Sequence, residues 1–341
     1  MTRRRRKGGK ARPRLRRIAL VTGAVLLFLF SVYAVAGVWF VHHSRTWYLD
    51  ALRTWPGFVS APLAWIGNPI GDITDAFGWT GEDVVYEYDE EAPAGSVLFA
   101  GAPVRTGAPA PDDIRIVDRG EFKLGWSDRL RHPVWCAYHV TKEGRYESSR
   151  RNFTRDREIA RAPNPGDYTK SGYDRGHLVP NYAMVTRYGP EIQRLTFMMS
   201  NIAPQSPSLN QGAWRDLEHR IADLWTARYG EIWVIVGCLP GNGEMISGSG
   251  VEVPGGFYQI VVAQEGMDVR AFAAVFPQII PFNAYPARNL ISIDELESMT
   301  GLDFLPELPS FIQDKLEAQL ATRLWPIRPL DIFRQIAIRL H

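Results

Sequence analysis

The feature that most constrains this chain is a long stretch near its N-terminus without any charge. No residue from Ile18 to Ser44 carries a formal charge. Its apolar part, residues 18–41, would form a helix about 36 Å long, which is enough to cross a hydrocarbon core of about 30 Å. The preceding residues, 1–17, contain ten Lys and Arg and no acid. Because basic flanks stay in the cytoplasm, we expect a basic cytoplasmic tail, a single-pass signal anchor, and the remaining chain outside.

A cleaved signal peptide is the alternative interpretation of the same stretch. The site Ala34-Val35-Ala36 follows a shorter apolar run, and cleavage near Ala36 would release a secreted protein. The apolar stretch continues to Val41, which favours the uncleaved anchor. Both interpretations place the rest of the chain in the periplasm or the extracellular space.

Composition divides the exported part into three segments. Residues 42–84 contain four Trp with Pro and Gly between them, and we expect a juxtamembrane segment of short helices or a stalk. Residues 85–325 form the main domain, and residues 326–341 form a C-terminal tail. Outside the basic tail, 29 basic residues stand against 37 acidic ones, so the exported part is mildly acidic. A hydrophobic content of 45% excludes a mostly disordered chain.

The main domain alternates short apolar runs with segments of helical periodicity. We expect strands at residues 134–140, 195–199, 231–237, 256–262 and 269–276, and helices at residues 217–227, 293–299 and 311–324. This mixture predicts an α+β fold with a mostly antiparallel sheet, in which a hairpin turns at Gly266. Cys136 and Cys238 both lie in predicted strands, and their spacing leaves open whether they are buried thiols or a disulfide.

A polar motif in the main domain carries the residue types that hydrolytic chemistry needs. The motif is Asp174-Arg175-Gly176-His177. A neutral His177 can take a proton from water near pH 7. Gly176 allows the backbone to approach a ligand closely, and Arg175 is a residue type that binds phosphate with two hydrogen bonds. Asp174 has two roles open to it, because it can fix the tautomer of His177 or hold the loop.

A second polar segment, Leu209–Glu218, supplies oxygen ligands. A site with the amide oxygen of Asn210 and few carboxylates suits a hard cation that keeps most of its waters, as Mg²⁺ does. On a helix that starts at Asn210, Glu218 follows at i+8 on the same broad side, where it could hold a metal-bound water. Taken singly, Asn210 would more often be a helix N-cap and Glu218 a solvated helix charge.

Taken together, the Asp-Arg-Gly-His motif, Ser200–Gln205 and Leu209–Glu218 resemble the DNA/RNA non-specific endonuclease family of the ββα-metal superfamily. The resemblance covers residues 85–315. It implies a ββα-metal active-site motif and hydrolysis of phosphodiester bonds in DNA and RNA. It also implies a single Mg²⁺, for which Mn²⁺ substitutes, and a homodimer.

The resemblance implies a role for each residue of these segments. His177 would be the general base that activates water, and Asn210 would be the only direct protein ligand of the Mg²⁺. Glu218 would orient metal-bound water, and Asn201 would support the site. Arg175 would face the phosphate or hold the local structure.

Basic residues near the motifs are the candidates for phosphate binding. The resemblance implies that Arg151 contacts the phosphate, with its neighbour Arg150 as a competitor. A basic groove would offset the acidic charge of the exported part, whereas the alternative for each side chain is a plain surface charge. The candidates for this groove are Arg150, Arg151, Arg155, Lys170, Arg175, Arg187 and Arg215.

Three functions are compatible with these observations. The first is a membrane-anchored, exported, Mg²⁺-dependent endonuclease that cuts DNA and RNA without sequence specificity. The second is a nucleic-acid capture or uptake module with weak or no catalysis. The third is a metal phosphodiesterase for a smaller substrate, which the acidic charge of the exported part favours.

Overall fold

The computed structural model describes residues 84–87, 96–327 and 331, except for 143, 145, 148, 247 and 283. The predicted cytoplasmic tail and membrane span lie outside the described residues, as do most of the juxtamembrane segment and most of the C-terminal tail. Within the described part of the chain, no helix has both the length and the apolar character needed to cross a membrane.

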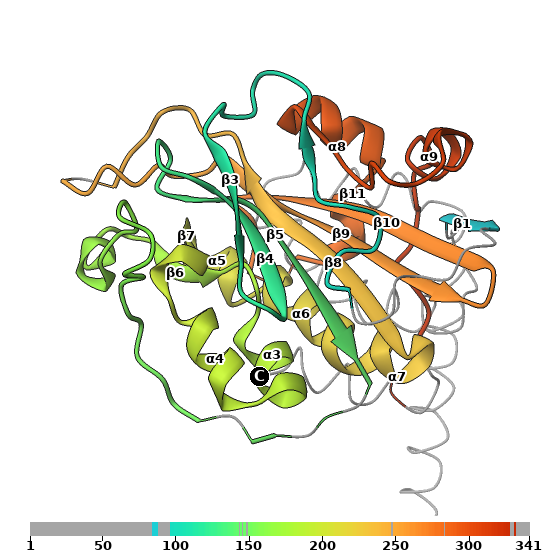
Figure 1. The fold of residues 1–341 in the computed structure, drawn as a ribbon, viewed down its shortest axis with the longest axis horizontal. Helices are drawn as coiled ribbons and strands as arrows, with labels where there is room; N and C mark the ends of the chain where they lie inside the picture. The colour runs from blue at the N-terminus through green and yellow to red at the C-terminus, as the bar shows by residue number, and fades with distance from the viewer. Residues whose placement is uncertain are drawn as a thin grey trace, which may run out of the picture. The chain divides into compact units, whose positions relative to one another are not determined.

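An antiparallel sheet of eight strands organises the main domain (Figure 1). Its strand order is β1-β10-β9-β8-β5-β4-β3, and β11 also pairs with β10. The strands are β1 (Val84–Glu87), β3 (Ile114–Asp118), β4 (Phe122–Ser127), β5 (His132–Thr141), β8 (Glu231–Leu239), β9 (Gly256–Glu265), β10 (Asp268–Pro277) and β11 (Leu290–Ile291). The predicted α+β fold with a mostly antiparallel sheet is confirmed, and β9 and β10 form the predicted hairpin at Gly266.

The central strands are covered on both faces. Consecutive side chains of a strand point to opposite faces, as Phe257 and Tyr258 do in β9. The ring centroid of Phe257 lies 5.5 Å from that of Trp214, and the centroid of Tyr258 lies 5.5 Å from that of Phe304. Because both faces are buried, these strands have nearly continuous apolar sequences.

A long helix lies on the Trp214 face of the sheet. It comprises α6 (Ala213–His219), a π-helical segment (Arg220–Trp225) and α7 (Thr226–Tyr229), so it contains the predicted helix at 217–227. Trp225 is fully buried, and its ring centroid lies 5.5 Å from that of Phe272 in β10. This contact fixes the helix against the sheet.

The opposite face is covered by short elements from both ends of the domain. These are β2 (Val104–Arg105), α8 (Ile293–Thr300), β12 (Leu302–Asp303) and α9 (Ser310–Leu316), whereas η4 (Pro286–Asn289) contacts α6 and β10. The helix predicted at 293–299 is α8, but α9 ends well before the predicted end at residue 324. Trp325 is fully buried against Trp225 and Phe272, and its carbonyl accepts a hydrogen bond from Trp225 Nε1 at 3.0 Å. Trp325 therefore lies on the Trp214 face, beside the long helix. At the end of α9 the carbonyl of Glu317 accepts a hydrogen bond from the N–H of Asp294 in α8.

The polar motifs lie in a segment of short elements beside the sheet. In chain order these are η1 (Pro165–Tyr168), β6 (Asp174–His177), α3 (Asn181–Tyr188), α4 (Pro190–Thr196), η2 (Met199–Asn201), β7 (Ile202–Gln205) and α5 (Pro207–Asn210). The strand predicted at 195–199 is wrong. The N–H of Met198 donates to the carbonyl of Leu195 at 3.1 Å, and Asn201 Nδ2 donates to the carbonyl of Thr196 at 3.0 Å. These bonds close a turn where a strand was expected.

Candidate active site

The strands β6 and β7 pair antiparallel and place His177 opposite Ile202. This register depends on Gly176, because a Cβ atom at that position would lie 2.4 Å from Gln205 Oε1. The glycine was expected to admit a ligand to the backbone. It instead admits the buried side chain of Gln205, so its role is in the packing of the two strands.

His177 is held between two aromatic rings. Its ring centroid lies 5.2 Å from that of Phe153 and 4.9 Å from that of Phe197, which it meets nearly at a right angle. The Nε2 atom is buried and has no hydrogen-bond partner in the described structure. Burial lowers the pKa of His177 to about 4, so the imidazole is neutral at neutral pH. A proton on Nε2 leaves Nδ1 as the nitrogen that can accept one.

Asp174 orients the predicted metal ligand. Its Oδ2 accepts hydrogen bonds from Asn210 Nδ2 at 2.9 Å and from Gln211 Nε2 at 3.0 Å. An ionised carboxylate only accepts hydrogen bonds, so the amide nitrogen of Asn210 must face Asp174 and its Oδ1 must face the other side. Of the two roles open to Asp174, these bonds support the holding of the loop. Gln211 was not predicted as a site residue, and its only signal in the sequence is its position next to Asn210.

Asn210 ends α5 rather than starting a helix. The N-cap of α5 is Ser206, whose Oγ accepts from the N–H of Leu209 at 3.4 Å, and the N-cap of α6 is Gly212. The alternative interpretation of Asn210 as an N-cap is therefore wrong. A Cβ atom at Gly212 would lie 2.3 Å from the carbonyl oxygen of Phe282, so the turn between the two helices is tightly packed.

Glu218 lies on α6 in a poorly solvated environment. Burial raises the pKa of Glu218 to about 8, and the nearby Trp214 and Arg215 side chains offset only part of this shift. Glu218 is half-buried and also contributes to the raised pKa of the fully buried Tyr138 of β5, after the larger effect of burial. These observations disfavour the alternative of a solvated helix charge.

Asn201 uses its side chain within the protein. Its Nδ2 donates to the carbonyls of Val179 and Thr196 at 2.9 and 3.0 Å, and its Oδ1 accepts from the N–H of Val179 at 2.9 Å. The residue is fully buried. These bonds tie the chain that follows His177 to the end of α4.

A comparison with known protein families identifies the family of this chain. The model of the DNA/RNA non-specific endonuclease family matches residues 100–311, which is more than half of the chain. The chain belongs to this family. It is therefore an endonuclease, an enzyme that hydrolyses phosphodiester bonds.

Relatives of this endonuclease occur in bacteria and in mitochondria. It is 28% identical to a nuclease of Nostoc sp. over 223 residues, which covers 62% of this chain and 80% of that protein. It is 30% identical to the mitochondrial endonuclease G of Bos taurus over 240 residues, with 61% and 79% covered. A crystal structure of the EndoG/EndoGI complex matches with a TM-score of 0.52 at 25% identity, covering 62% of this chain and 91% of that one.

The donor set of the endonuclease fits a hard divalent cation. The hydrogen bond to Asp174 fixes the Oδ1 of Asn210 as a neutral oxygen donor. Glu218 is a half-buried carboxylate whose pKa is raised by desolvation, and a cation nearby would offset that cost. Asn210 would therefore hold the ion directly, and Glu218 would act through water.

The predicted basic groove is only partly available. The guanidinium of Arg175 donates twice to the carbonyl of Pro165, at 3.0 and 2.6 Å, and lies 5.5 Å from the ring centroid of Phe153. These contacts favour the structural role for Arg175. The prediction that Arg187 belongs to the groove is wrong, because its side chain is only 9% exposed and donates to the carbonyl of Thr141.

The remaining basic candidates are more accessible. Arg151 is half-buried beside α4, where its Nε donates to Gln193 Oε1 at 3.3 Å. Arg215 lies close enough to Glu218 to lower the pKa of that acid. Three further candidates are exposed, namely Arg150, Arg155 and Lys170.

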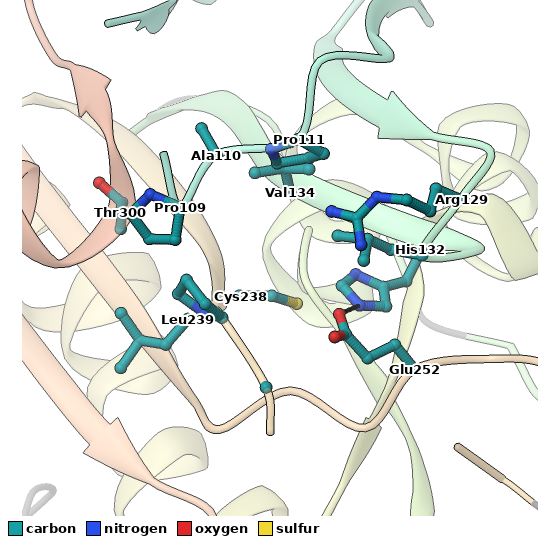
Figure 2. A pocket seen from close by; sticks show the side chains of 13 residues that line it. Pro109, Ala110, Pro111, Arg129, His132, Val134, Cys238, Leu239, Glu252 and Thr300 are labelled. Carbon is teal, nitrogen blue, oxygen red and sulfur yellow. Dashed lines mark ion pairs between the residues drawn. The ribbon is translucent and has the colours of Figure 1, made fainter. Parts of the chain in front are cut away.

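A pocket elsewhere in the endonuclease contains none of the predicted site residues. It has a volume of about 190 Å³, and Figure 2 shows the Glu252 carboxylate facing His132 on one side of it. Burial opposes ionisation of His132, but Cys238 and Glu252 outweigh it and raise the pKa to about 10. Cys238 and Cys136 are both free and buried, so the question of a disulfide is answered in favour of two thiols.

Proposed function

We propose that this endonuclease requires Mg²⁺ and cuts DNA and RNA without sequence specificity, with His177 as the general base and Asn210 as the metal ligand. The observation that carries the proposal is the hydrogen bond between Asn210 and Asp174, a residue on the same strand as the neutral His177. Mn²⁺, another cation that oxygen ligands suit, would replace Mg²⁺.

His177 performs the proton transfer in this mechanism. Its Nδ1 accepts a proton from the water that attacks the phosphorus, while Phe153 and Phe197 hold the ring in place. An anionic phosphate beside the ring would raise the pKa of His177 from about 4, which makes it a stronger base once substrate is bound.

The other residues stabilise charge and orient water. Bound Mg²⁺ would supply Lewis-acid stabilisation of the charge on the phosphate. Glu218 accepts hydrogen bonds from water in the site, and Arg151 neutralises charge that develops on the phosphate oxygens. No residue in this scheme acts on a 2′-hydroxyl, so both DNA and RNA are substrates.

A cleavage assay with the purified full-length chain tests the proposal. Supercoiled plasmid and RNA are incubated with Mg²⁺ or with EDTA, using the wild type, His177→Ala and Asn210→Ala. EDTA and Asn210→Ala should abolish cutting, and His177→Ala should slow it by about 10²–10⁴-fold. Asn242→Ala, in an exposed loop, is the matched control and should cut like the wild type. Full metal-dependent activity of a folded Asn210→Ala variant would refute the assignment.

The same assay separates the remaining alternatives. Because the chain is an endonuclease by family, a capture module without catalysis is not retained. A phosphodiesterase for a smaller substrate is favoured by the acidic exported part. Hydrolysis of a small aryl phosphodiester together with intact plasmid would support that function instead.

The cellular location is part of the same proposal. The charge-free stretch at residues 18–41, behind a basic tail, supports a membrane anchor with the nuclease domain outside the cytoplasm. Protease added to intact cells should degrade the domain, and the domain should sediment with membranes. A soluble domain that starts after Ala36 would instead establish cleavage and secretion. The resemblance also supports a homodimer, which light scattering on the purified chain tests.

A further inference from the structure

Three carboxylates converge at a place separate from the active site. Asp294 and Glu297 lie on α8, and Glu317 follows α9, two helices that pack near each other in Figure 1. One carboxylate oxygen from each residue lies within 4.8 Å of the others. These acids are far in sequence from the residues proposed for cleavage, and the nuclease activity gives them no role.

The backbone around the three acids is fixed by hydrogen bonds. Asp294 and Glu297 are three residues apart on α8 and so lie on neighbouring positions of one face. The N–H of Asp294 donates to the carbonyl of Glu317 at 3.2 Å, which joins the start of α8 to the end of α9. The Glu297 carboxylate accepts from the N–H of Phe304 at 2.7 Å. The convergence is therefore built into the fold.

A second observation points to a missing ligand. Glu317 is only 4% exposed, and its Oε1 is buried without a hydrogen-bond partner among the described residues. The charged neighbours that act on Glu317 are all acids, since Asp303 and Asp314 add to Asp294 and Glu297. Ionisation of a buried carboxylate is costly, and a cation at this place would offset that cost.

We propose that Asp294, Glu297 and Glu317 bind a Ca²⁺ ion that joins α8 to α9. All three donors are carboxylate oxygens, which hard cations prefer. An ion with Ca–O distances of about 2.3–2.6 Å can hold oxygens up to roughly 5 Å apart, whereas the shorter Mg–O distance of about 2.1 Å allows only roughly 4 Å. The three oxygens lie within 4.8 Å of one another, which is inside the span that Ca–O distances allow. Three carboxylates at one place also suit Ca²⁺, because Mg²⁺ usually keeps several waters and binds only one or two carboxylates. This site does not depend on the proposed nuclease mechanism.

The experiment measures Ca²⁺ binding with the active-site ligand removed. Full-length Asn210→Ala protein, freed of metal with EDTA and dialysed, is titrated with Ca²⁺ by calorimetry and followed by thermal unfolding. We expect saturable binding of one ion and a higher unfolding temperature in Ca²⁺. Adding Glu317→Gln or Asp294→Asn to this variant should weaken Ca²⁺ binding by at least about tenfold and remove the thermal shift.

Controls make both outcomes informative. Asp314 is an exposed acid beside the site that is not a proposed ligand, so Asp314→Asn should keep the response to Ca²⁺. Glu317→Gln removes a charge without changing the size of the side chain, and Asp294→Asn replaces it should the first variant fail to fold. The proposal is overturned if Ca²⁺ neither binds to Asn210→Ala nor shifts its unfolding temperature. It is also overturned if the Glu317 and Asp294 variants respond to Ca²⁺ in the same way as the Asn210→Ala parent. A stronger response to Mg²⁺ than to Ca²⁺ would overturn the choice of ion.

Discussion

At the scale of single residues, one hydrogen bond sets which atom Asn210 presents to a metal. Asp174 can only accept, and it thereby holds the amide nitrogen of Asn210 at 2.9 Å. Asp174→Asn introduces a side chain that also donates, so the amide of Asn210 is free to turn over. We expect the Mg²⁺ concentration for half-maximal plasmid cleavage to rise about 10–100-fold, with activity recovering at high Mg²⁺.

Gln211→Ala is the control for this prediction, because it keeps the Asp174–Asn210 bond and should show a smaller rise. Superimposable Mg²⁺ curves for Asp174→Asn and the wild type would contradict this role.

The burial of His177 has a second consequence at this scale, which is a dependence of stability on pH. The pKa of about 4 in the folded protein lies below the ordinary value of 6.5. The folded state therefore binds fewer protons than the unfolded state between these values, and the contribution of His177 is present above pH 6.5 and lost as pH falls toward 4. His177→Gln does not titrate in this range. Between pH 6.5 and 4.5 the unfolding temperature of both proteins should fall. We expect the fall to be smaller for His177→Gln than for the wild type, with a difference of roughly 4 °C. If the unfolding temperatures of the wild type and His177→Gln fell by the same amount, His177 would not be desolvated.

At the scale of elements, the pairing of β6 with β7 depends on the absence of a side chain at Gly176. A Cβ atom there would lie 2.4 Å from Gln205 Oε1, and Gln205 is fully buried. Gly176→Ala should therefore separate the strands, lower the free energy of unfolding by about 1–3 kcal/mol, and reduce cleavage by displacing His177. Gly166→Ala is the matched control. Gly166 lies in η1, and a Cβ atom at this residue would have no neighbouring atom within 4 Å. Chemical denaturation of both variants checks this, and equal stability would show that the strands tolerate the methyl group.

Some elements could be predicted from the sequence and others could not, because they are held in place by different kinds of contact. The strands β5, β8, β9 and β10 were predictable because they are long apolar runs buried on both faces. The apolar run at 195–199 was misread because five residues fit a strand or a turn equally well, and only the bond from the nearby Asn201 side chain to Thr196 and the local turn bonds decide between them. The end of α9 was missed because the sequence does not show that the carbonyl of Glu317 accepts a hydrogen bond from the N–H of Asp294 in α8.

The site residues divide in the same way. The motif residues could be named from their sequence spacing, but their partners could not. Asp174 meets Asn210 across 36 positions of sequence, and Arg187 is taken out of the groove by contacts with β5. A basic side chain looks the same in sequence whether it faces a substrate or a carbonyl group. Only the fold separates Arg187 from the exposed Arg150 and Lys170.

At the scale of the whole molecule, the acidic charge of the chain after residue 17 limits how nucleic acid can bind. Outside the basic tail, 29 basic residues stand against 37 acids, and Arg175 and Arg187 are occupied by contacts within the protein. These two arginines are therefore less available to meet phosphates. Each phosphate contact to duplex DNA contributes a slope of about −0.9 to the plot of log affinity against log salt concentration. This domain should consequently show a shallow salt dependence, governed by a small number of named residues.

That expectation gives a quantitative prediction for the two exposed candidates. Binding of a short duplex is measured between 50 and 200 mM salt in the inactive His177→Ala background, so that the DNA stays intact. Arg150→Ala with Lys170→Ala should reduce the slope by about 2 if both side chains contact phosphate, and it should weaken binding equally for unrelated sequences. Lys315 is exposed but lies over the ring of Tyr86, next to the Ca²⁺ site proposed above, so Lys315→Ala should leave the slope unchanged. An unchanged slope in the double variant would assign phosphate binding to Arg151 and Arg215, which lie beside His177 and Glu218 in the proposed mechanism. A loss confined to one DNA sequence would instead contradict cleavage without sequence specificity.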